Sequence, residues 1–229
     1  MENAINRNVD IVFCIDGTGS MSPIMDDIKR NAVRFYTEVA EECYAHNANI
    51  TALRVRIITF RDYECDGEKA MEESSFFELP DDDDLFGSYL NGIVPDGGGD
   101  APENGLEALH YAFRSDFVTG AKDRQVIVLI TDADALPLLA RRGRGCYPED
   151  MSDEDKLINT WAGAVQEPGV KLVARAKRLV MFAPAGTKYQ ELSTKLKGSI
   201  FQPVEPGHGL EGFNFKDIVK VIAASVGGQ

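Results

Sequence analysis

The chain has 229 residues, with 24 lysines and arginines against 37 aspartates and glutamates, so its formal net charge is −13. So acidic a chain is a poor candidate for binding nucleic acid, which requires clustered cations, or for docking on anionic membranes. The length suggests one large domain or two small ones, and the 44% apolar content is sufficient for a buried core. We therefore expect a folded protein with neither a nucleic-acid nor a membrane partner.

The sequence contains no apolar run of the kind that targeting or membrane insertion requires. Its first ten residues lack an apolar stretch, and no later run approaches the roughly 18 apolar residues of a transmembrane helix. Cys14, Cys43, Cys65 and Cys146 show no close spacing of the metal-binding type, and the three histidines are scattered. These observations favour a cytoplasmic location, reduced thiols and no zinc site built from histidine and cysteine.

The first elements along the chain form a strand, a loop and a helix. Residues 10–15 (DIVFCI) are a continuous apolar run, typical of a strand buried on both faces of a parallel sheet. The turn 16–20 follows, and Ser22 and Pro23 then open a helix whose apolar residues recur every three or four positions as far as Cys43. Further along, the pattern predicts strands at 53–60 and 75–79, a short helix at 85–90 after the acidic run 81–84, and a helix at 101–113 after the glycines 97–99.

The second half of the chain continues the alternation of strands and helices. Residues 125–131 (QVIVLIT) are strongly apolar and end at Asp132. Weaker strand patterns lie at 177–183 and 199–204, with a helix at 189–196 between them and a final helix from Phe215 onward. This alternation predicts an α/β fold with a doubly wound, mainly parallel, six-stranded sheet flanked by helices. No linker or repeat interrupts it, so we expect one domain over residues 1–229.

Residues 133–177, between the fourth and fifth predicted strands, are far longer than a strand-to-helix connection requires. They contain a basic, glycine-rich stretch at 141–145, an acidic stretch at 148–155 and Trp161. We expect an insertion at the rim of the sheet, made of a solvated loop and two short helices. The alternative is a partner-binding surface.

Candidate ligand residues follow the strands that should be neighbours in the sheet. Doubly wound sheets bind ligands beyond the carboxyl ends of their strands, where the strand order reverses. Asp16 and Asp132 would meet there, Thr18 and Ser20 would turn toward the same point, and the loop ending at Asp100 could close the third side. Carboxylates and hydroxyls without histidine or thiolate form a hard oxygen site that suits Mg²⁺ or Mn²⁺.

These residues also have simpler structural interpretations. Asp16 and Ser20 could cap a turn or a helix. Asp100 with Glu103 has the D-x-x-E spacing of an N-terminal helix cap, so capping and metal ligation both stay open for Asp100. Arg61 and Asp62 suggest a local ion pair at the end of the second strand.

The residues described so far resemble a known family, the von Willebrand factor A domain with its metal-ion-dependent adhesion site. The resemblance lies in the sequence DGTGSM at 16–21 after an apolar strand, the glycine-rich loop, and Thr131-Asp132 after the fourth strand, and it extends from residue 10 to the last helix. The sequences FRDY at 60–63 and GGGDAPE at 97–103 are similar to the intracellular branch, which includes A domains attached to alpha-type kinases and those of bacterial stress or conflict systems.

The resemblance implies roles for individual residues. Thr18 and Ser20 would coordinate the metal through their hydroxyls, whereas Asp16 and Asp132 would hold metal-bound waters and those hydroxyls. The family usually supplies a third hydroxyl, from a threonine in the loop before the third helix. This chain has Asp100 near that place, which departs from the family pattern.

The resemblance implies a protein-binding module, in which the metal completes its coordination with an oxygen ligand, often acidic, from a partner protein. The alternative is a haloacid-dehalogenase-like phosphohydrolase, because Asp16-Gly17-Thr18 and Asp132-x-Asp134 mimic the acidic motifs of that family. Its nucleophilic aspartate would fall at Cys14, so the essential nucleophile is missing. The phosphate-binding motif GxxxxGK[ST] is also absent, and we expect no enzymatic activity.

Overall fold

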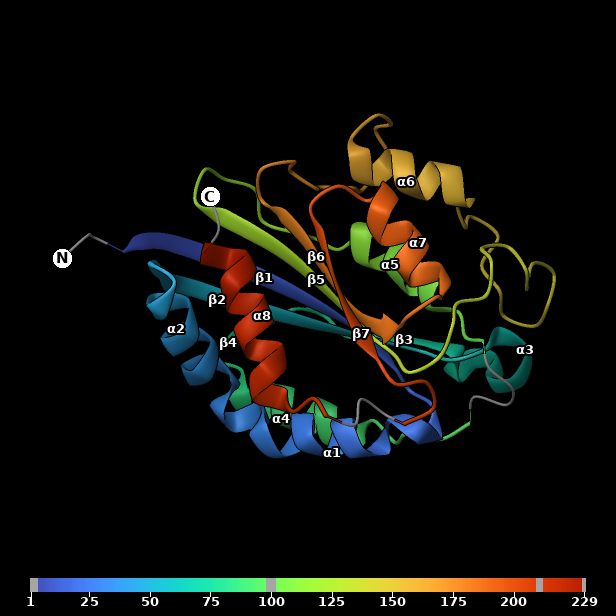
Figure 1. Ribbon diagram of the computed structural model, residues 1–229, viewed down its shortest axis with the longest axis horizontal. Coiled ribbons are helices and arrows are strands. Elements are labelled where there is room, and N and C mark those ends of the chain that lie inside the picture. The colour runs from blue at the N-terminus through green and yellow to red at the C-terminus, as the bar shows by residue number, and fades with distance from the viewer. Residues whose placement is uncertain (1–3, 98–101, 209–211, 228–229) are drawn as a thin grey trace.

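The structure is a computed structural model that describes residues 4–97, 102–208 and 212–227. In this part of the chain a seven-stranded sheet has the order β3-β2-β1-β5-β6-β7, and β4 also pairs with β2 (Figure 1). The strands are β1 (Ile5–Asp16), β2 (Ala48–Phe60), β3 (Met71–Glu73), β4 (Phe77–Leu79), β5 (Asp123–Ile130), β6 (Lys177–Pro184) and β7 (Ser199–Val204). Only β3 and β4 are antiparallel to their neighbour. The predicted α/β fold with a mainly parallel sheet is confirmed.

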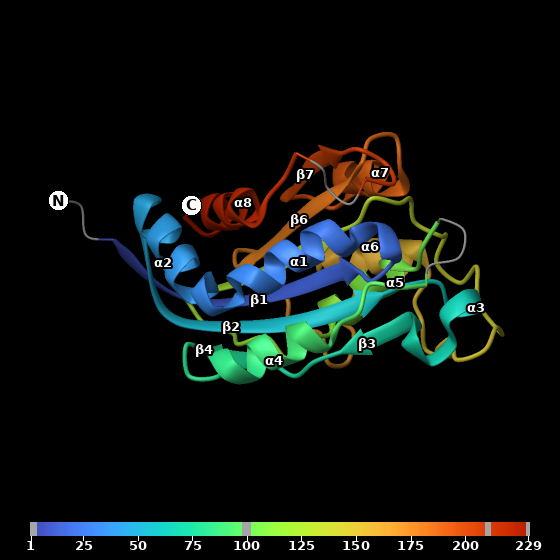
Figure 2. The ribbon, with the colours of Figure 1, turned by 90° about the horizontal axis from the view of Figure 1, so that it is seen from below.

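Helices cover both faces of this sheet (Figure 2). They are α1 (Ser22–Asn31), α2 (Phe35–Ala45), α3 (Tyr63–Asp66), α4 (Asp83–Gly92), α5 (Gly105–Phe113), α6 (Glu154–Ala162), α7 (Lys188–Lys195) and α8 (Phe215–Gly227). The buried core on one face includes side chains of α1, α2, α4 and α8, and the core on the other includes α5, α6 and α7. Within the described ranges, no helix combines the length and the apolar character needed to cross a bilayer.

The central strands are buried because both faces are covered. All eight residues of β5 are buried, and in β1 Phe13 and Ile15 belong to one core while Val12 and Cys14 belong to the other. Side chains that alternate between two apolar layers explain why these strands are continuous apolar runs in the sequence.

The edge of the sheet next to β2 differs from the prediction of one strand at 75–79. Two short strands, β3 and β4, pair with different parts of β2, so the sheet has seven strands instead of six. Ser74 lies between them and forms hydrogen bonds of 2.9 Å with both the N–H and the C=O of Ile57, the N–H bonding to the serine hydroxyl. A side-chain oxygen thus replaces a backbone acceptor, and the regular ladder is interrupted there.

Two predicted helices have different bounds in the structure. The helix predicted from Ser22 to Cys43 is divided into α1 and α2 by a 3₁₀ turn at Ala32–Arg34. The helix predicted from residue 101 begins only at Gly105, where Asn104 occupies the N-cap position and Glu103 forms a β-bridge with Ala135. Glu103 therefore lies before α5 and not in its first turn. Asp100 itself lies outside the described residues.

In the segment 133–177, one helix packs on the α5 face, where two short helices were predicted. Its described residues contain one α-helix, α6. Trp161 of α6 is 1% exposed, its ring lies 5.2 Å from that of Phe113, and its Nε1 donates to the carbonyl of Lys197 at 3.0 Å. The apolar residues of α6 form a helical stripe, so the helix requires an apolar surface to cover.

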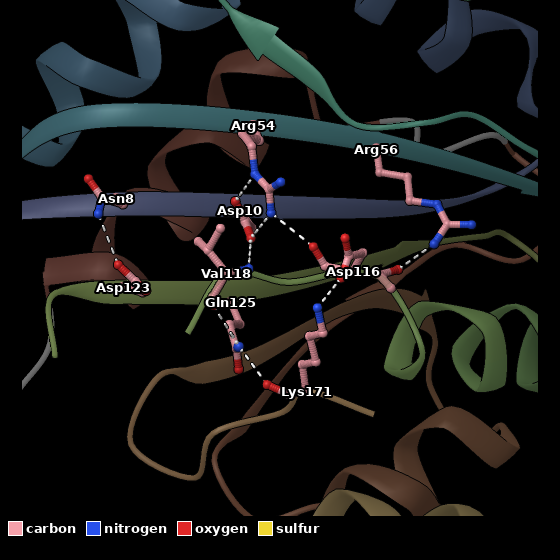
Figure 3. Close-up of polar contacts among 10 residues, drawn as sticks. Asn8, Asp10, Arg54, Arg56, Asp116, Val118, Asp123, Gln125 and Lys171 are labelled. Carbon is pink, nitrogen blue, oxygen red and sulfur yellow. Dashed lines mark hydrogen bonds and ion pairs between the residues drawn. The ribbon is translucent and has the colours of Figure 1, made fainter. Parts of the chain in front are cut away.

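Near the middle of β1 and β2, a buried ion pair ties connecting loops to the sheet (Figure 3). Asp10 accepts two hydrogen bonds from the guanidinium of Arg54, at 2.8 and 2.6 Å, and a third from the backbone N–H of Val118 at 2.8 Å. The side chain of Gln125 donates to the carbonyls of Val118 and Lys171. The loops before β5 and β6 are thereby fixed to the same end of the sheet.

Candidate functional site

The sheet topology brings the predicted ligand residues to one edge. β1 and β5 are parallel neighbours in register, with Ile15 opposite Ile130, so Asp16 and Asp132 both lie at the carboxyl ends of adjacent strands. The strand order also reverses here, since the chain continues from β1 to β2 on one side and β5 lies on the other. This is the crevice in which doubly wound sheets bind ligands.

Four of the five predicted site residues belong to one hydrogen-bonded network. The hydroxyl of Ser20 donates to Oδ1 of Asp132 at 2.9 Å and lies 3.3 Å from the hydroxyl of Thr18. The backbone N–H of Thr18 donates to Oδ1 of Asp16 at 2.9 Å, and the hydroxyl of Thr131 donates to Oδ2 of Asp16 at 2.6 Å. The structure therefore brings Asp16, Thr18, Ser20 and Asp132 together.

The carboxyl group of Asp16 is buried without a cationic partner in this network. The side chain is 0% exposed, and its two oxygens accept hydrogen bonds from neutral groups of Thr18 and Thr131. Burial raises the pKa of Asp16 to about 6, and the nearby charge of Asp132 acts in the same direction, although the hydrogen bonds from Thr131 and Thr18 oppose it. A bound cation would relieve the cost of this buried negative charge.

Thr18, Ser20 and Asp132 line an open cleft of about 500 Å³. Its other walls include small residues of the segments 184–187 and 206–207, at the carboxyl ends of β6 and β7. Three carboxylate residues, Glu103, Asp132 and Asp134, line the cleft, and no lysine or arginine does so in the described part of the chain. The cleft is accordingly polar, acidic and wide enough for a side chain from another molecule.

Glu103 is a further residue of this cleft that the sequence interpretation missed. It is 2% exposed, and its buried Oε2 has no hydrogen-bond partner among the described residues. Burial raises the pKa of Glu103 to about 8, the charge of Asp16 acts in the same direction, and Arg141 opposes the shift. The D-x-x-E spacing suggested a helix cap, but the backbone of Glu103 pairs instead with Asp134 and Leu136. Only the path of this loop across the end of β5 places its carboxyl group in the cleft.

Arg61 supports the loop that carries Thr18 and Ser20. The predicted ion pair between Arg61 and Asp62 is wrong, because Asp62 accepts two hydrogen bonds from Arg141, at 2.7 and 2.5 Å. The guanidinium of Arg61 is 2% exposed and donates to the carbonyls of Gly17 and Asp96, both at 3.0 Å. A Cβ atom at Gly17 would lie 2.7 Å from Cζ of Arg61, so the loop requires glycine at this position.

The donor set fits a hard divalent cation. The network offers two hydroxyl and two carboxylate side chains, all with oxygen donors, and oxygen donors are the ligands that Mg²⁺ and Mn²⁺ prefer. No group of three or more histidine, cysteine, aspartate or glutamate residues suited to a metal occurs in the ranges that the structure describes. A metal at this place would depend on the hydroxyls of Thr18 and Ser20 as well as on carboxylates.

A family model for the von Willebrand factor A domain matches residues 10–138, more than half of the chain. The chain belongs to the von Willebrand factor A domain family. The match includes β1 from residue 10 onward, β5 and every residue of the network described above. No curated protein matches the chain at a significant level.

Solved structures with the same fold include other von Willebrand factor A domains and larger proteins. The pilus adhesin SpaC from Lactobacillus rhamnosus GG superposes with a TM-score of 0.56 at 10% identity, covering 96% of this chain and 31% of SpaC. A von Willebrand factor type A protein from Catenulispora acidiphila superposes with a TM-score of 0.52 at 12% identity, covering 97% of this chain and 43% of that one. The chain thus spans less than half the length of either protein, and the likeness concerns the fold.

Proposed function

We propose that this von Willebrand factor A domain is a metal-dependent protein-binding module. Domains of this family are generally protein-interaction modules. The observation that carries the metal dependence is the network in which Ser20 links Thr18 to Asp132 at the wall of the cleft. Thr18 and Ser20 would hold Mg²⁺ or Mn²⁺ directly, whereas Asp16 and Asp132 would orient these hydroxyls and metal-bound water.

The partner would contribute an oxygen ligand, often from an aspartate or glutamate. When bound, the cation supplies a positive centre that attracts such a carboxylate. Asp16 accepts a hydrogen bond from the backbone of Thr18, and Asp132 accepts one from the hydroxyl of Ser20. These bonds hold the hydroxyls of Thr18 and Ser20 in place before a partner protein binds. Because both hydroxyls are neutral, much of the charge of the cation would be left for the partner's carboxylate.

Asp100 and Glu103 are the candidates for the third side of the metal. Glu103 has a buried carboxyl oxygen that lacks a partner among the described residues, and Asp100 is near the place where the family has threonine. If Asp100 is a direct ligand, Asp100→Thr should weaken Mg²⁺ binding in calorimetric titration, because a charged ligand is replaced by a neutral one. The matched variant Glu103→Gln should likewise weaken Mg²⁺ binding if Glu103 is a direct ligand. Equal Mg²⁺ affinities for a variant and the wild type would eliminate that residue as a ligand.

We further propose that the chain does not catalyse hydrolysis. In the phosphohydrolase alternative the nucleophile would be at Cys14, which is 0% exposed and whose thiol donates to the carbonyl of Ala108 at 3.6 Å. Burial raises the pKa of this thiol, so the reactive thiolate is disfavoured. Turnover of p-nitrophenyl phosphate that disappears in Cys14→Ser would contradict the proposal.

A cytoplasmic location is proposed on the state of the thiols. All four cysteines are free, and Cys65 and Cys146 are exposed. Exposed free thiols are characteristic of reducing compartments.

Thermal unfolding with and without metal tests the proposed function. A cation that binds only the folded chain adds about 2.7 kcal/mol at a hundredfold excess over its Kd, so millimolar Mg²⁺ should raise the Tm of chelator-treated protein. Ser20→Ala should lose most of this shift. Ser193→Ala, which removes an exposed hydroxyl of α7 that bonds to Gln190, should retain it. An unchanged Tm in the wild type would eliminate the metal site.

Affinity capture tests the partner directly. Binding of a protein to the wild type should require Mg²⁺ and should be lost in Asp16→Ala, because that variant removes the acceptor for the backbone of Thr18. Capture that is indifferent to both metal and substitution would place the interaction elsewhere on the domain.

A further inference from the structure

A second cavity adjoins the cleft at the carboxyl ends of β6 and β7. It has a volume of about 320 Å³ and is lined by Ala185, Pro203, Val204, Glu205, Pro206 and Phe213. Five of these six residues are apolar. Ala185 and Pro206 also line the cleft, so the two cavities share a wall. We call this second cavity the side pocket.

Contacts with the sheet hold the walls of the side pocket in place. Pro184 pairs with Val204 where β6 and β7 end side by side (Figure 1). The ring of Phe213 lies 5.5 Å from that of Phe182 in β6, and Phe213 is only half-buried. Pro203 is exposed, so its apolar surface also faces solvent. A preformed apolar pocket that is open to solvent suits an apolar side chain from another molecule.

The strand order gives the separation between the side pocket and the candidate metal site. Asp132 follows β5, and β6 and β7 are the next two strands of the sheet. Neighbouring strands lie about 4.8 Å apart, so two spacings span roughly 10 Å. The N–H of Gly207, in the loop after β7, donates to the carbonyl of Asp132 at 2.9 Å and keeps this loop against the site. An extended chain advances about 3.3 Å per residue, so about three residues would connect the metal to the side pocket.

Charge further limits what can occupy both cavities at once. Glu103, Asp132 and Asp134 line the cleft, Glu205 lines the side pocket, and no lysine or arginine lines either cavity in the described part of the chain. A bound cation would accept one carboxylate from a partner. A second acidic side chain beside Glu205 would be repelled, and the apolar walls of the side pocket would not compensate a buried charge.

We propose that the partner binds through an extended segment in which a large apolar residue, such as leucine or phenylalanine, fills the side pocket about three positions from the acidic residue on the metal. This inference rests on the proposed function, because the acidic residue requires the metal. Pockets for individual side chains give an extended peptide its specificity, and burial of a large apolar side chain stabilises the complex. The metal thus selects an acidic residue, and the side pocket distinguishes one acidic segment from another.

Selection of the full chain against a phage-displayed library of random dodecapeptides, in Mg²⁺, tests this inference. The wild type should enrich peptides that contain an aspartate or glutamate with a large apolar residue about three positions away. Pro203→Glu places a charge in the side pocket at an exposed position, so it should still select the acidic residue but lose the apolar preference. Pro168→Glu is the matched control, since Pro168 is exposed and lines neither cavity, and it should select as the wild type does.

Fluorescence anisotropy with the most enriched peptide measures the contribution of the side pocket. Alanine in place of the apolar residue of this peptide should weaken binding to the wild type by about tenfold or more, and should leave binding to Pro203→Glu unchanged. Both proline variants should keep the Mg²⁺-induced rise in Tm.

Equal affinities of the two peptides for the wild type, or an undiminished apolar preference in Pro203→Glu, would overturn the inference. A Tm that rises with Mg²⁺ without enrichment of any peptide would overturn this inference alone. A Tm that does not rise in the wild type would overturn the proposed function together with it.

Discussion

Strand β1 contains two buried aspartates, Asp10 near its middle and Asp16 at its carboxyl end, and the two carboxyl groups have opposite surroundings. Asp10 is 1% exposed and accepts a pair of hydrogen bonds from the guanidinium of Arg54 (Figure 3). Asp16 is 0% exposed and accepts hydrogen bonds from the backbone of Thr18 and the hydroxyl of Thr131, with the carboxyl group of Asp132 nearby. One carboxylate is neutralised by the fold itself, and the other is not.

This difference separates a structural ion pair from the proposed binding site. Arg54 also donates to the carbonyl of Asp116 and lies 4.4 Å above the ring of Phe76, so the ion pair joins β1, β2 and a loop. At the carboxyl end, the buried Oε2 of Glu103 has no partner among the described residues. Buried charge without a counter-charge is costly, and the proposed cation would supply that counter-charge.

The largest expected effect comes from removing the ion pair between Arg54 and Asp10. Arg54→Ala should lower the free energy of unfolding by about 4 kcal/mol, because it leaves Asp10 buried without its counter-charge. Urea unfolding measures this loss. Arg30→Ala, which removes an exposed partner of Asp27, should cost less than about 1 kcal/mol. A similar cost for both variants would refute the distinction between buried and exposed pairs.

A buried histidine, which becomes positively charged when it is protonated, can be compared with the two buried aspartates. His110 of α5 is 1% exposed, and Nδ1 lies 2.9 Å from a guanidinium nitrogen of Arg114. Burial, followed by the charge of Arg114, lowers the pKa of His110 to about 4. Between pH 6.5 and 4 the unfolded chain therefore binds a proton that the folded chain does not, and stability falls as the pH falls.

Urea unfolding at two pH values checks this sign. From pH 7 to pH 5 the wild type should lose about 2 kcal/mol that His110→Gln does not lose, because glutamine does not titrate. His208→Gln is the control, since His208 is exposed. An identical pH dependence in the wild type and His110→Gln would show that another group is responsible.

A further expected effect concerns the stability contributed by Asp16, in the proposed binding site. The pKa of Asp16, about 6, lies above its ordinary value of 3.8, so ionisation of Asp16 destabilises the metal-free fold increasingly as the pH rises from 4 to 6. Above pH 6, Asp16→Asn should therefore stabilise metal-free protein, and this gain should vanish below pH 4.

The same substitution at Asp10 should change the stability of the fold in the opposite direction. Asp10→Asn leaves Arg54 without its anion and should destabilise the fold, whereas Asp16→Asn should make it more stable in chelator but insensitive to Mg²⁺. Urea unfolding of both variants in chelator measures the difference. A loss of stability in both would show that Asp16 is as structural as Asp10.

The sequence by itself determined the architecture and most of the candidate site. Continuous apolar runs at 10–15 and 125–131 predict buried parallel strands, because only residues covered on both faces lack polar alternation. Once these strands are neighbours, Asp16 and Asp132 must lie at one edge, and Thr18 and Ser20 follow within the next four residues. Local sequence carries this information because the turn directly follows the strand.

Only the tertiary structure decided which polar residues have partners. Arg61 and Asp62 are adjacent in sequence, but Arg61 lies under Gly17 while Asp62 binds Arg141 of the distant segment 133–177. Glu103 belongs to the cleft only because its loop crosses the end of β5. Such contacts depend on how helices, strands and loops that are distant in sequence pack together, and a local pattern of residues does not determine that packing.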